Sequence, residues 1–323
     1  MSDMKRILCI GPKNEQYCRI FAEHGLEVTF LSSTDEDEIA EAARGCEAII
    51  FSSTRFTESL FSKLPDLKII SRSGIGIDTV DIPAATAHGV IVCNSASYGT
   101  YDVAEHTVAL LLALVHSVPR FDSAIKRDND WSGRGVPMAH RLSEKTLGIV
   151  GFGRISRHLC RMMAGFGMRI LVSDPYASPE AAAAAGVTLV SLDTLLAEAD
   201  ILSLNAPLTD GTRHMICAAS IAKMKRGVLL VNTSRGGLVD EAALLDALRE
   251  GKIAGAALDV FETEPFAADH PFRTMENVIL TPHVAWRSAE AIRDLTLEVT
   301  GNVIDYFEGR PLANALNGQA LGL

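Results

Sequence analysis

A glycine-rich turn between an apolar run and a helical pattern constrains the fold of this chain more than any other stretch. Residues 147–150 are largely apolar, Gly151 and Gly153 follow, and residues 154–166 have helical spacing. This order predicts strand, tight turn and helix, the context in which Gly-x-Gly-x-x-Gly binds a dinucleotide pyrophosphate at the helix N-terminus. Ser156 occupies the third position, where glycine usually permits close packing of helix on strand. We expect this serine to alter packing rather than cofactor choice.

A second predicted strand ends in an acidic residue, Asp174. It follows Gly151 at close to the roughly 20 residues expected for the acid that bonds a ribose 2′-hydroxyl. Because a carboxylate there repels a 2′-phosphate, the sequence predicts NAD rather than NADP. The alternative is that Asp174 only begins the turn at Pro175.

Short apolar runs alternate with amphipathic segments along the whole chain, which indicates βα units and parallel sheets. In the first region, strands are predicted at residues 6–10, 28–31, 48–51, 68–71 and 90–93, with helices such as 36–44 and 57–64. In the second, strands are predicted at 147–150, 170–173, 201–204, 228–232, 255–258 and 278–280, with helices such as 154–166, 192–199 and 241–250. The predicted fold class is α/β, with two doubly wound parallel-sheet domains.

Three further segments complete the predicted organisation. Residues 101–118 form a strongly apolar helix, which is either a core helix or a connector and subunit contact. Residues 122–141 are polar and contain Gly133 and Gly135, which indicates a surface excursion. The last predicted helix, residues 288–307, leaves the second sheet, and we expect it to pack on the first domain.

Composition excludes several classes of protein. The net charge of −10 and the lack of a basic run argue against nucleic-acid binding. Residues 1–10 lack a signal-peptide pattern, and the longest apolar run, 108–115, is far shorter than the roughly 20 residues of a membrane span. The six scattered cysteines, without a Cys-x-x-Cys pair, indicate buried thiols in a reducing compartment rather than disulfides or a metal site. We therefore expect a cytoplasmic protein.

Three charged or titratable residues follow late strands of the second predicted sheet: Arg235, Glu264 and His283. Each alone is most simply a surface residue, but ligands of doubly wound sheets bind at the carboxyl ends of strands. Arg235 can hold a substrate carboxylate with its planar guanidinium, and His283 can donate a proton to a carbonyl oxygen. Glu264 can orient the imidazole and favour its protonated form, although Glu262 is an equal candidate on sequence alone. Together they suit the reduction of a 2-oxo acid.

In its motifs the chain resembles the NAD-dependent D-2-hydroxyacid dehydrogenase family, which includes D-3-phosphoglycerate dehydrogenases. The resemblance covers nearly the whole chain and rests on residues 72–78, the turn at Gly151, and residues 204–209, 231–240, 257–265 and 281–283. It implies that Arg235, Glu264 and His283 are the catalytic set, which favours Glu264 over Glu262. It also implies a small 2-oxo or 2-hydroxy acid as substrate.

The same resemblance implies the domain architecture and the remaining ligand contacts. Residues 1–100 plus 288–323 would form a flavodoxin-like substrate domain, and 101–287 an inserted Rossmann domain that binds NAD and pairs two subunits as a homodimer. The cofactor residues would be Ile75, Gly151, Phe152, Gly153, Arg154, Ile155, Asp174, Pro207, Thr212, Thr233, Ser234, Arg235, Asp259, His283 and Ala285. The substrate residues would be Arg72, Ser73, Gly74, Ile75, Arg235, His283 and Trp286, with backbone N–H groups of residues 73–76 meeting the substrate carboxylate.

Trp286 departs from the small, glycine-rich residues usual after the catalytic histidine of the family. It resembles the C-terminal-binding-protein branch, so it either lines a pocket for an apolar or sulfur-containing side chain or packs at the domain interface. That branch gives the alternative function, an NAD(H)-gated protein-interaction module. A third alternative is an oxidoreductase for a small inorganic or one-carbon substrate. We expect the plain enzyme, because the chain ends soon after its last helix.

Overall fold

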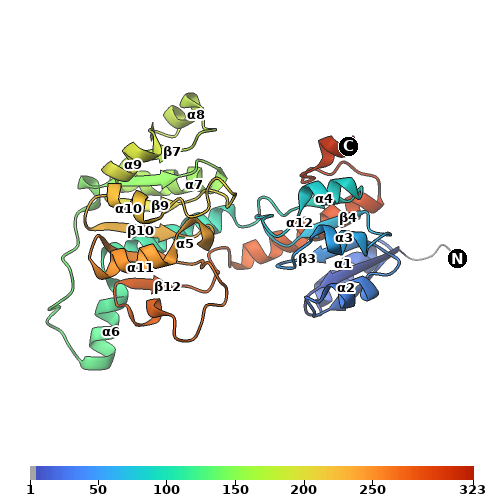
Figure 1. Ribbon diagram of the computed structural model, residues 1–323, viewed down its shortest axis with the longest axis horizontal. Coiled ribbons are helices and arrows are strands. Elements are labelled where there is room, and N and C mark those ends of the chain that lie inside the picture. Colours follow the sequence, from blue (N-terminus) through green and yellow to red (C-terminus); the bar gives the residue numbers. More distant parts are fainter. Residues whose placement is uncertain (1–4) are drawn as a thin grey trace. The chain divides into compact units, whose positions relative to one another are not determined.

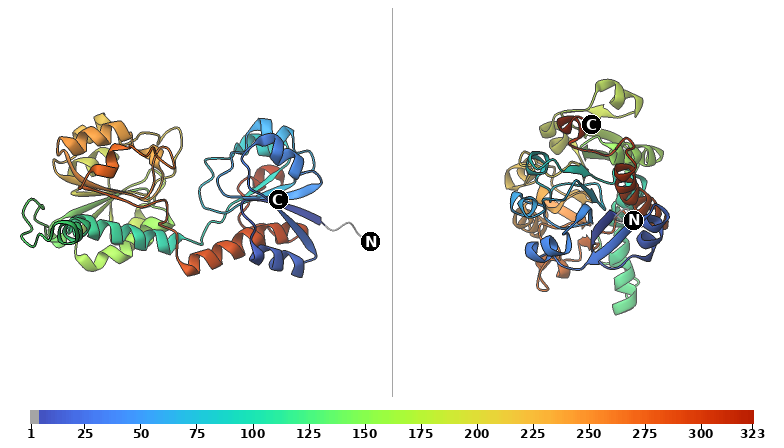
Figure 2. Two further views of the ribbon diagram at one scale, coloured as in Figure 1. Left: turned by 90° about the horizontal axis from the view of Figure 1, so that it is seen from below. Right: turned by 90° about the vertical axis from the view of Figure 1, so that its right-hand side faces the viewer.

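The computed structural model describes residues 5–323, so the first four residues of the N-terminal segment considered above lie outside it. The chain divides into two compact units, one made of residues up to Gly99 together with Ser288–Leu323, and one made of Thr100–Arg287. Figures 1 and 2 show that each unit is built around its own sheet, with helices on both sides. The prediction of two parallel-sheet α/β domains is confirmed.

The first unit contains a five-stranded parallel sheet in the order β2-β1-β3-β4-β5, which is the flavodoxin-like order. Its strands are β1 (Lys5–Ile10), β2 (Leu26–Leu31), β3 (Cys46–Phe51), β4 (Ile69–Arg72) and β5 (Ile91–Cys93). Helices α2 (Glu36–Ala42), α3 (Glu58–Ser62) and α4 (Ile82–Ala87) pack on one face. The other face is covered by α1 (Glu15–Glu23) and α12 (Ala289–Phe307), and α13 (Gly318–Leu321) lies near the C-terminus.

The C-terminal helix α12 packs on the first sheet, as the sequence predicted. Val299 and Val303 are fully buried among residues of β1, β3 and β4. Polar contacts add to this packing, because Ser71 Oγ of β4 donates to the Val299 carbonyl at 3.0 Å. Asn302 Nδ2 in turn donates to Ser71 Oγ at 3.1 Å. The two ends of the chain therefore form one core.

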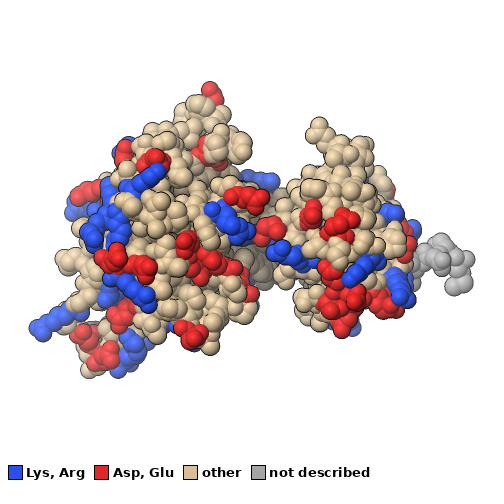
Figure 3. All heavy atoms as spheres, viewed as in Figure 1, with Lys and Arg blue, Asp and Glu red and all other residues tan. Residues whose placement is uncertain are grey.

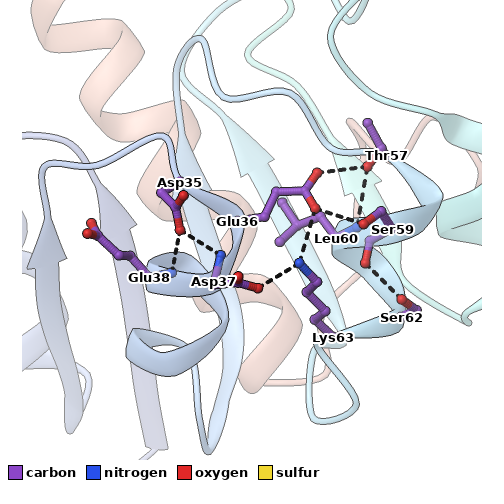
Figure 4. A network of polar contacts seen from close by, with 9 residues as sticks. All are labelled: Asp35, Glu36, Asp37, Glu38, Thr57, Ser59, Leu60, Ser62 and Lys63. Carbon is purple, nitrogen blue, oxygen red and sulfur yellow. Dashed lines mark hydrogen bonds and ion pairs between the residues drawn. The ribbon is translucent and has the colours of Figure 1, made fainter.

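An acidic network joins α2 to α3 on the surface of this unit (Figure 4). Glu36 accepts hydrogen bonds from Thr57 Oγ1 at 3.1 Å and Ser59 Oγ at 2.8 Å. Lys63 lies 2.7 Å from Asp37, and Asp35 caps the N-terminus of α2. Acidic side chains gather in Figure 3 where Figure 1 places α2, and elsewhere in that view Lys and Arg alternate with Asp and Glu.

The second unit contains a seven-stranded parallel sheet in the order β12-β11-β10-β9-β6-β7-β8. Its strands are β6 (Thr146–Val150), β7 (Arg169–Ser173), β8 (Thr188–Leu189), β9 (Ile201–Leu204), β10 (Val228–Asn232), β11 (Ile253–Leu258) and β12 (Val278–Leu280). From β6 to β8, each new strand is added toward one edge of the sheet. From β9 to β12, each new strand is added toward the opposite edge. The switch point of this Rossmann order lies between β6 and β9, where a ligand crevice is expected.

Helices cover both faces of this sheet, which is why its strands are almost continuously apolar. On one face lie α5 (Thr100–Val115), α7 (Arg154–Met163) and α8 (Pro179–Ala184). On the other lie α9 (Leu192–Glu198), α10 (Ala218–Lys223) and α11 (Glu241–Arg249). Short 3₁₀ turns occur at η1 (Leu142–Glu144), η2 (Ala164–Phe166), η3 (Gly236–Leu238) and η4 (Pro271–Thr274).

The helix predicted at residues 101–118 is shorter than expected, and part of the predicted surface excursion is helical. Helix α5 ends at Val115, Ser117 adopts the left-handed conformation with φ 51°, and α6 (Val118–Asp128) begins there with Pro119 in its first turn. Helix α6 is polar and buries no residue, so its sequence lacks the apolar stripe from which a helix is predicted. Within the described chain, no single helix is long and apolar enough to cross a membrane; α5 and α6 meet that criterion only as a pair bent by 60°.

All six cysteines are free thiols. Cys9, Cys46, Cys93 and Cys160 are buried, as predicted, but Cys18 and Cys217 are only partly buried. Burial raises the pKa of Cys9 to about 12, so that thiol stays protonated at neutral pH. The expectation of uniformly buried thiols is therefore wrong for two positions.

Candidate active site

The glycine-rich turn lies at the switch point of the seven-stranded sheet and fits a dinucleotide. Gly151 has φ 89°, and a Cβ there would lie 2.8 Å from the Asn205 carbonyl oxygen. Because Asn205 directly follows β9, only glycine lets the two strand ends approach so closely. A Cβ on Gly153 would meet no atom within 4 Å, so the space over the N-terminus of α7 is open. Helix α7 has no side-chain cap, which leaves its first N–H groups for an anion.

Ser156 replaces the third glycine without disturbing this turn. Its side chain is fully buried, and its hydroxyl donates to the Gly151 carbonyl at 2.7 Å. The serine therefore satisfies its own polar group by stabilising the first glycine of the turn. This agrees with the expectation that Ser156 affects packing.

Asp174 joins the end of β7 to the glycine-rich turn. Its Oδ2 accepts a hydrogen bond from the Phe152 N–H at 2.7 Å, and its Oδ1 accepts one from the Tyr176 N–H at 2.8 Å. The second bond is the turn-initiating role that the sequence offered as the alternative, and the first places the carboxylate beside the proposed pyrophosphate site. The turn-initiating role therefore occurs, and the predicted ribose contact of Asp174 stays a prediction.

His283 and Glu264 form a direct pair after β12 and β11. His283 Nδ1 lies 2.7 Å from Glu264 Oε2. Because an ionised carboxylate only accepts, Nδ1 bears the proton in this bond and Nε2 is left for a substrate. Glu264 Oε1 accepts the Phe261 N–H at 2.9 Å, which fixes the carboxylate from its other side. His283 itself has φ 54°, and its N–H donates to the Asp259 carbonyl at 2.8 Å.

The surroundings keep Glu264 ionised. Burial acts to raise the pKa of Glu264, but the hydrogen bonds from His283 and Phe261, with the charges of His283 and Arg235, hold it below its ordinary value. An ionised Glu264 accepts the proton of His283 Nδ1 in a hydrogen bond, so the pair orients the imidazole at the edge of the sheet.

Arg235 follows β10, the neighbour of β11 in the sheet. Its Nη1 donates to the Ser234 carbonyl at 2.8 Å, and its charge acts on Glu264. The next residue, Gly236, packs against the backbone of the Glu264 loop, where a Cβ would lie 1.9 Å from the Phe261 carbonyl carbon. This contact brings the Arg235 and Glu264 loops together.

Asp259 organises the turn that holds His283. Its carboxylate is fully buried and accepts hydrogen bonds from Thr281 Oγ1 at 2.5 Å and from the Val284 and Ala285 N–H groups at 2.9 Å each. A buried carboxylate with three donors is well satisfied. The side chain has no exposed surface, and the predicted cofactor contact of Asp259 stays a prediction.

Apart from Ile75 in the other unit and from Arg154 and Ile155 in α7, the other predicted cofactor residues occupy loops along the same edge of the sheet. Thr212 Oγ1 donates to the Pro207 carbonyl at 2.7 Å, and Ser234 Oγ donates to the Ala206 carbonyl at 2.7 Å. Thr233 Oγ1 lies 2.7 Å from Thr107 Oγ1, and both hydroxyls are buried. The side chain of Phe152 is buried, whereas Arg154 at the start of α7 is exposed and Ile155 is partly buried.

Helix α5 contributes polar residues that the sequence analysis did not identify as functional. His106 Nε2 lies 3.2 Å from Thr281 Oγ1 and 3.8 Å from Asp259 Oδ1. Thr107 meets the Thr233 loop. The only sequence signal is this polar pair, His106 and Thr107, within a strongly apolar helix.

The predicted substrate loop lies after β4 in the five-stranded unit. Arg72 donates to the carbonyl of Ser52, which follows β3, at 3.0 Å and to the Gly76 carbonyl, so its guanidinium links two neighbouring loops. The N–H groups of Ser73 and Gly74 also donate within the protein, to the carbonyls of Phe51 and Arg72. These two N–H groups are therefore engaged within the protein, and the contact of this loop with a substrate carboxylate stays a prediction.

Two backbone donors of that loop remain for a ligand. In the described part of the chain, neither the Ile75 N–H nor the Gly76 N–H donates to a protein acceptor. The Ile75 carbonyl accepts from Asn94 Nδ2 at 2.7 Å, which fixes the peptide. In the other unit, Trp286 is partly buried, and its Nε1 donates to the His283 carbonyl at 3.2 Å.

Comparison with known proteins agrees with this site. Residues 108–285 match the NAD-binding domain model of the D-isomer specific 2-hydroxyacid dehydrogenases. The chain is 36% identical over 313 residues to D-3-phosphoglycerate dehydrogenase from Archaeoglobus fulgidus, covering 97% of this chain and 59% of that protein. It spans between 51% and 60% of the length of the curated D-3-phosphoglycerate dehydrogenases compared here.

Solved structures agree as well. A glyoxylate reductase from Paecilomyes thermophila matches with a TM-score of 0.89 and 30% identity, over 98% of this chain and 99% of its own. D-lactate dehydrogenase from Aquifex aeolicus, complexed with NAD and lactic acid, matches with a TM-score of 0.83 and 32% identity, over 94% of this chain and 96% of its own. This chain therefore belongs to the D-isomer specific 2-hydroxyacid dehydrogenase family, and its seven-stranded unit includes the NAD-binding domain of that family.

Proposed function

We propose that this chain is an NAD-dependent 2-oxo acid reductase that interconverts a small 2-oxo acid and its D-2-hydroxy acid. The observation that supports this most strongly is the 2.7 Å bond between His283 and Glu264 at the carboxyl edge of the NAD-binding unit. Arg235 follows the neighbouring strand, so an acid and a carboxylate-binding cation lie in adjacent loops. Reduction of a 2-oxo acid needs both.

Bound NADH would supply the hydride, and each protein residue has a separate task. His283 donates a proton from Nε2 to the carbonyl oxygen as it becomes an alkoxide, and Glu264 stabilises the imidazolium through Nδ1. Arg235 binds the substrate carboxylate and carbonyl oxygen with its planar donors. Asp259 acts by holding the turn of residues 281–285, and the glycine-rich turn with Asp174 holds the dinucleotide. No metal is required for these tasks.

Screening NADH oxidation against a panel of 2-oxo acids tests this function. The panel contains glyoxylate, pyruvate, hydroxypyruvate, and branched-chain, aromatic and methylthio 2-oxo acids. We expect turnover with at least one of them and a D-2-hydroxy product on chiral analysis. An L-product, or NADH binding without turnover of any member, would contradict the proposal.

The interaction-module alternative receives no support from the relatives, which are named as dehydrogenases and reductases. The His283–Glu264 pair also has the geometry of an acid catalyst rather than of a peptide-binding surface. The alternative of a small inorganic or one-carbon substrate is less suited to Trp286 beside His283. We propose that this indole borders the substrate side chain, which favours the apolar and sulfur-containing members of the panel.

Asp174 is the basis of the proposed preference for NAD over NADP. Its carboxylate bonds the Phe152 N–H at the glycine-rich turn, where a 2′-phosphate would meet a negative charge. Asp174→Ala should narrow the ratio of kcat/KM for NADH over NADPH by about tenfold, because it removes a repulsion worth about 1.4 kcal/mol. Asp193→Ala, an exposed change on α9, is the control. A constant ratio in Asp174→Ala would contradict the assignment.

We also propose a homodimer formed through the seven-stranded units. Helix α6 and the segment after it expose large apolar side chains, among them Phe121, Trp131 at 77% and Met138 at 88%. A groove of about 360 Å³ opens beside them at the amino ends of the strands, with Leu114, Met138 and Ile279 in its lining. Exposed apolar groups of this size are typical of subunit contacts.

Light scattering coupled to size-exclusion chromatography tests the dimer. The unmodified chain should have twice the mass of one subunit, and Trp131→Ser with Met138→Ser should shift it toward the monomer. Tyr176→Ser removes an aromatic residue outside this surface that is 94% exposed, and it serves as the control. A monomeric unmodified chain would contradict the proposal.

The free thiols support a cytoplasmic location, which fractionation of cells can test.

A further inference from the structure

Two carboxylates outside the catalytic set bond each other's backbone. The Glu262 N–H donates to Glu241 Oε1 at 2.8 Å, and the Glu241 N–H donates to Glu262 Oε1 at 3.2 Å. Glu241 is the first residue of α11, and Glu262 lies in the loop after β11. The two bonds form a closed ring between an exposed loop and the start of a helix, which we call the reciprocal pair.

The reciprocal pair acts on the peptide unit next to the one that supports the catalytic carboxylate. Two consecutive N–H groups donate to two different carboxylates: that of Phe261 donates to Glu264, and that of Glu262 donates to Glu241. On the opposite side, the Phe261 carbonyl lies against Gly236, where a Cβ would be 2.0 Å from its oxygen. The peptide between Phe261 and Glu262 is thus held from two sides.

Local charges favour this arrangement. The N-terminus of α11 is the positive end of the helix, so it stabilises Glu241 and Glu262 as anions. Each carboxylate also contacts one histidine. His214 Nε2 lies 3.0 Å from Glu262 Oε1, and His270 Nε2 lies 3.3 Å from Glu241 Oε2. His214 adopts φ 50°, and its N–H donates to the Gly237 carbonyl at 2.8 Å, which ties it to the Arg235 loop.

We propose that Glu241 and Glu262 are positioning residues that hold the residue 261–264 loop so that Glu264 stays bonded to His283. The inference rests on the proposed 2-oxo acid reductase function. The two carboxylates of this loop, only two positions apart, then have different partners. Glu264 bonds the imidazole of His283, and Glu262 bonds the first residue of α11. Neither Glu241 nor Glu262 touches substrate or cofactor in this role.

Alanine and glutamine variants at both positions test the proposal by kinetics. Glu241→Ala and Glu262→Ala should each lower kcat about tenfold, the effect of losing one well-formed hydrogen bond, with an unchanged KM for NADH. The double variant should lose no more than either single variant, because the two bonds form one unit. Glu241→Gln and Glu262→Gln keep an acceptor oxygen and should restore most of kcat. Thr263→Ala in the same loop is the matched control and should match the unmodified enzyme.

A second measurement does not depend on turnover. In NMR spectra, the imidazole signal of His283 should shift in both alanine variants and return in both glutamine variants. If no 2-oxo acid is turned over but this pattern appears, the proposed function fails while the positioning role stands. Unchanged kcat with an unchanged His283 signal in both alanine variants would overturn the inference, and so would equal losses in the alanine and glutamine variants.

Discussion

The carboxyl edges of the two parallel sheets are built from similar loops but use charged residues in different ways. At the edge of the seven-stranded sheet, His283 and Glu264 bond each other and leave a ring nitrogen for a ligand. At the edge of the five-stranded sheet, Arg72 donates to the backbone of its own loop and of the loop after β3. There the groups left for a ligand are the N–H groups of Ile75 and Gly76.

This difference teaches that the doubly wound fold positions loops without deciding their chemistry. One edge holds titratable side chains that suit proton transfer. The other holds a rigid backbone whose charged residue is used for support, and fixed N–H groups suit recognition of an anion. Substitutions that separate proton transfer from recognition therefore test the comparison.

His283→Ala should have the largest effect. Removing a general acid should lower kcat by about 10³-fold, while the dissociation constant of NADH changes little, because the dinucleotide is held mainly elsewhere. Steady-state kinetics and a fluorescence titration with NADH measure the two quantities. His140→Ala, a change of an exposed histidine, is the control. If His283→Ala kept full turnover, His283 would not be the proton donor, and proton transfer would not be assigned to this edge.

Arg235→Lys should have the next largest effect and tests recognition at the edge of the seven-stranded sheet. Lysine keeps the charge but cannot form the two parallel bonds of a guanidinium. We expect kcat/KM for the 2-oxo acid to fall about 100-fold, which corresponds to about 2.7 kcal/mol. Arg249→Lys on the exposed end of α11 is the matched control. A kinetically silent Arg235→Lys would contradict the role of Arg235 in substrate recognition.

Gly74→Ala tests that five-stranded edge directly. Gly74 has φ 153°, which a Cβ disfavours, and an added Cβ would lie 2.9 Å from Arg72 Nη1. The loop should shift, so KM for the 2-oxo acid should rise about tenfold while NADH binding is unchanged, as expected when only substrate binding is lost. Gly89→Ala, at the end of α4 in the same unit, also has positive φ and is the control for general strain. Equal effects of the two changes would argue against a role in recognition.

The sequence predicted the fold better than it predicted the contacts within the site. Alternation of apolar runs and helical patterns is a local property, so both sheets could be inferred, whereas polar α6 could not. Glu262 and Glu264 were equivalent on sequence because both follow β11 in one loop. Their assignments depend on Glu241 and His283, which other elements bring to the loop. The buried bond from Ser156 to the Gly151 carbonyl likewise depends on how the turn closes.

The smallest expected effect concerns stability in acid, and it should be confined to the edge with titratable groups. The pKa of Glu264 is held below its ordinary value in the folded chain, so the bond with His283 stabilises the fold above the unfolded value of about 4.3. That contribution is lost as the pH falls through the lower folded pKa. The unfolding temperature of the unmodified chain should therefore exceed that of Glu264→Gln near pH 6, and the gap should close below about pH 4. Glu298→Gln in the five-stranded unit is the comparison variant, because Glu298 accepts bonds from Ser97 but has no histidine partner among the described contacts. A gap for Glu264→Gln that stayed constant from pH 6 to pH 3 would show that its carboxylate is not stabilised in the folded state. The two edges would then differ in geometry but not in their use of charge.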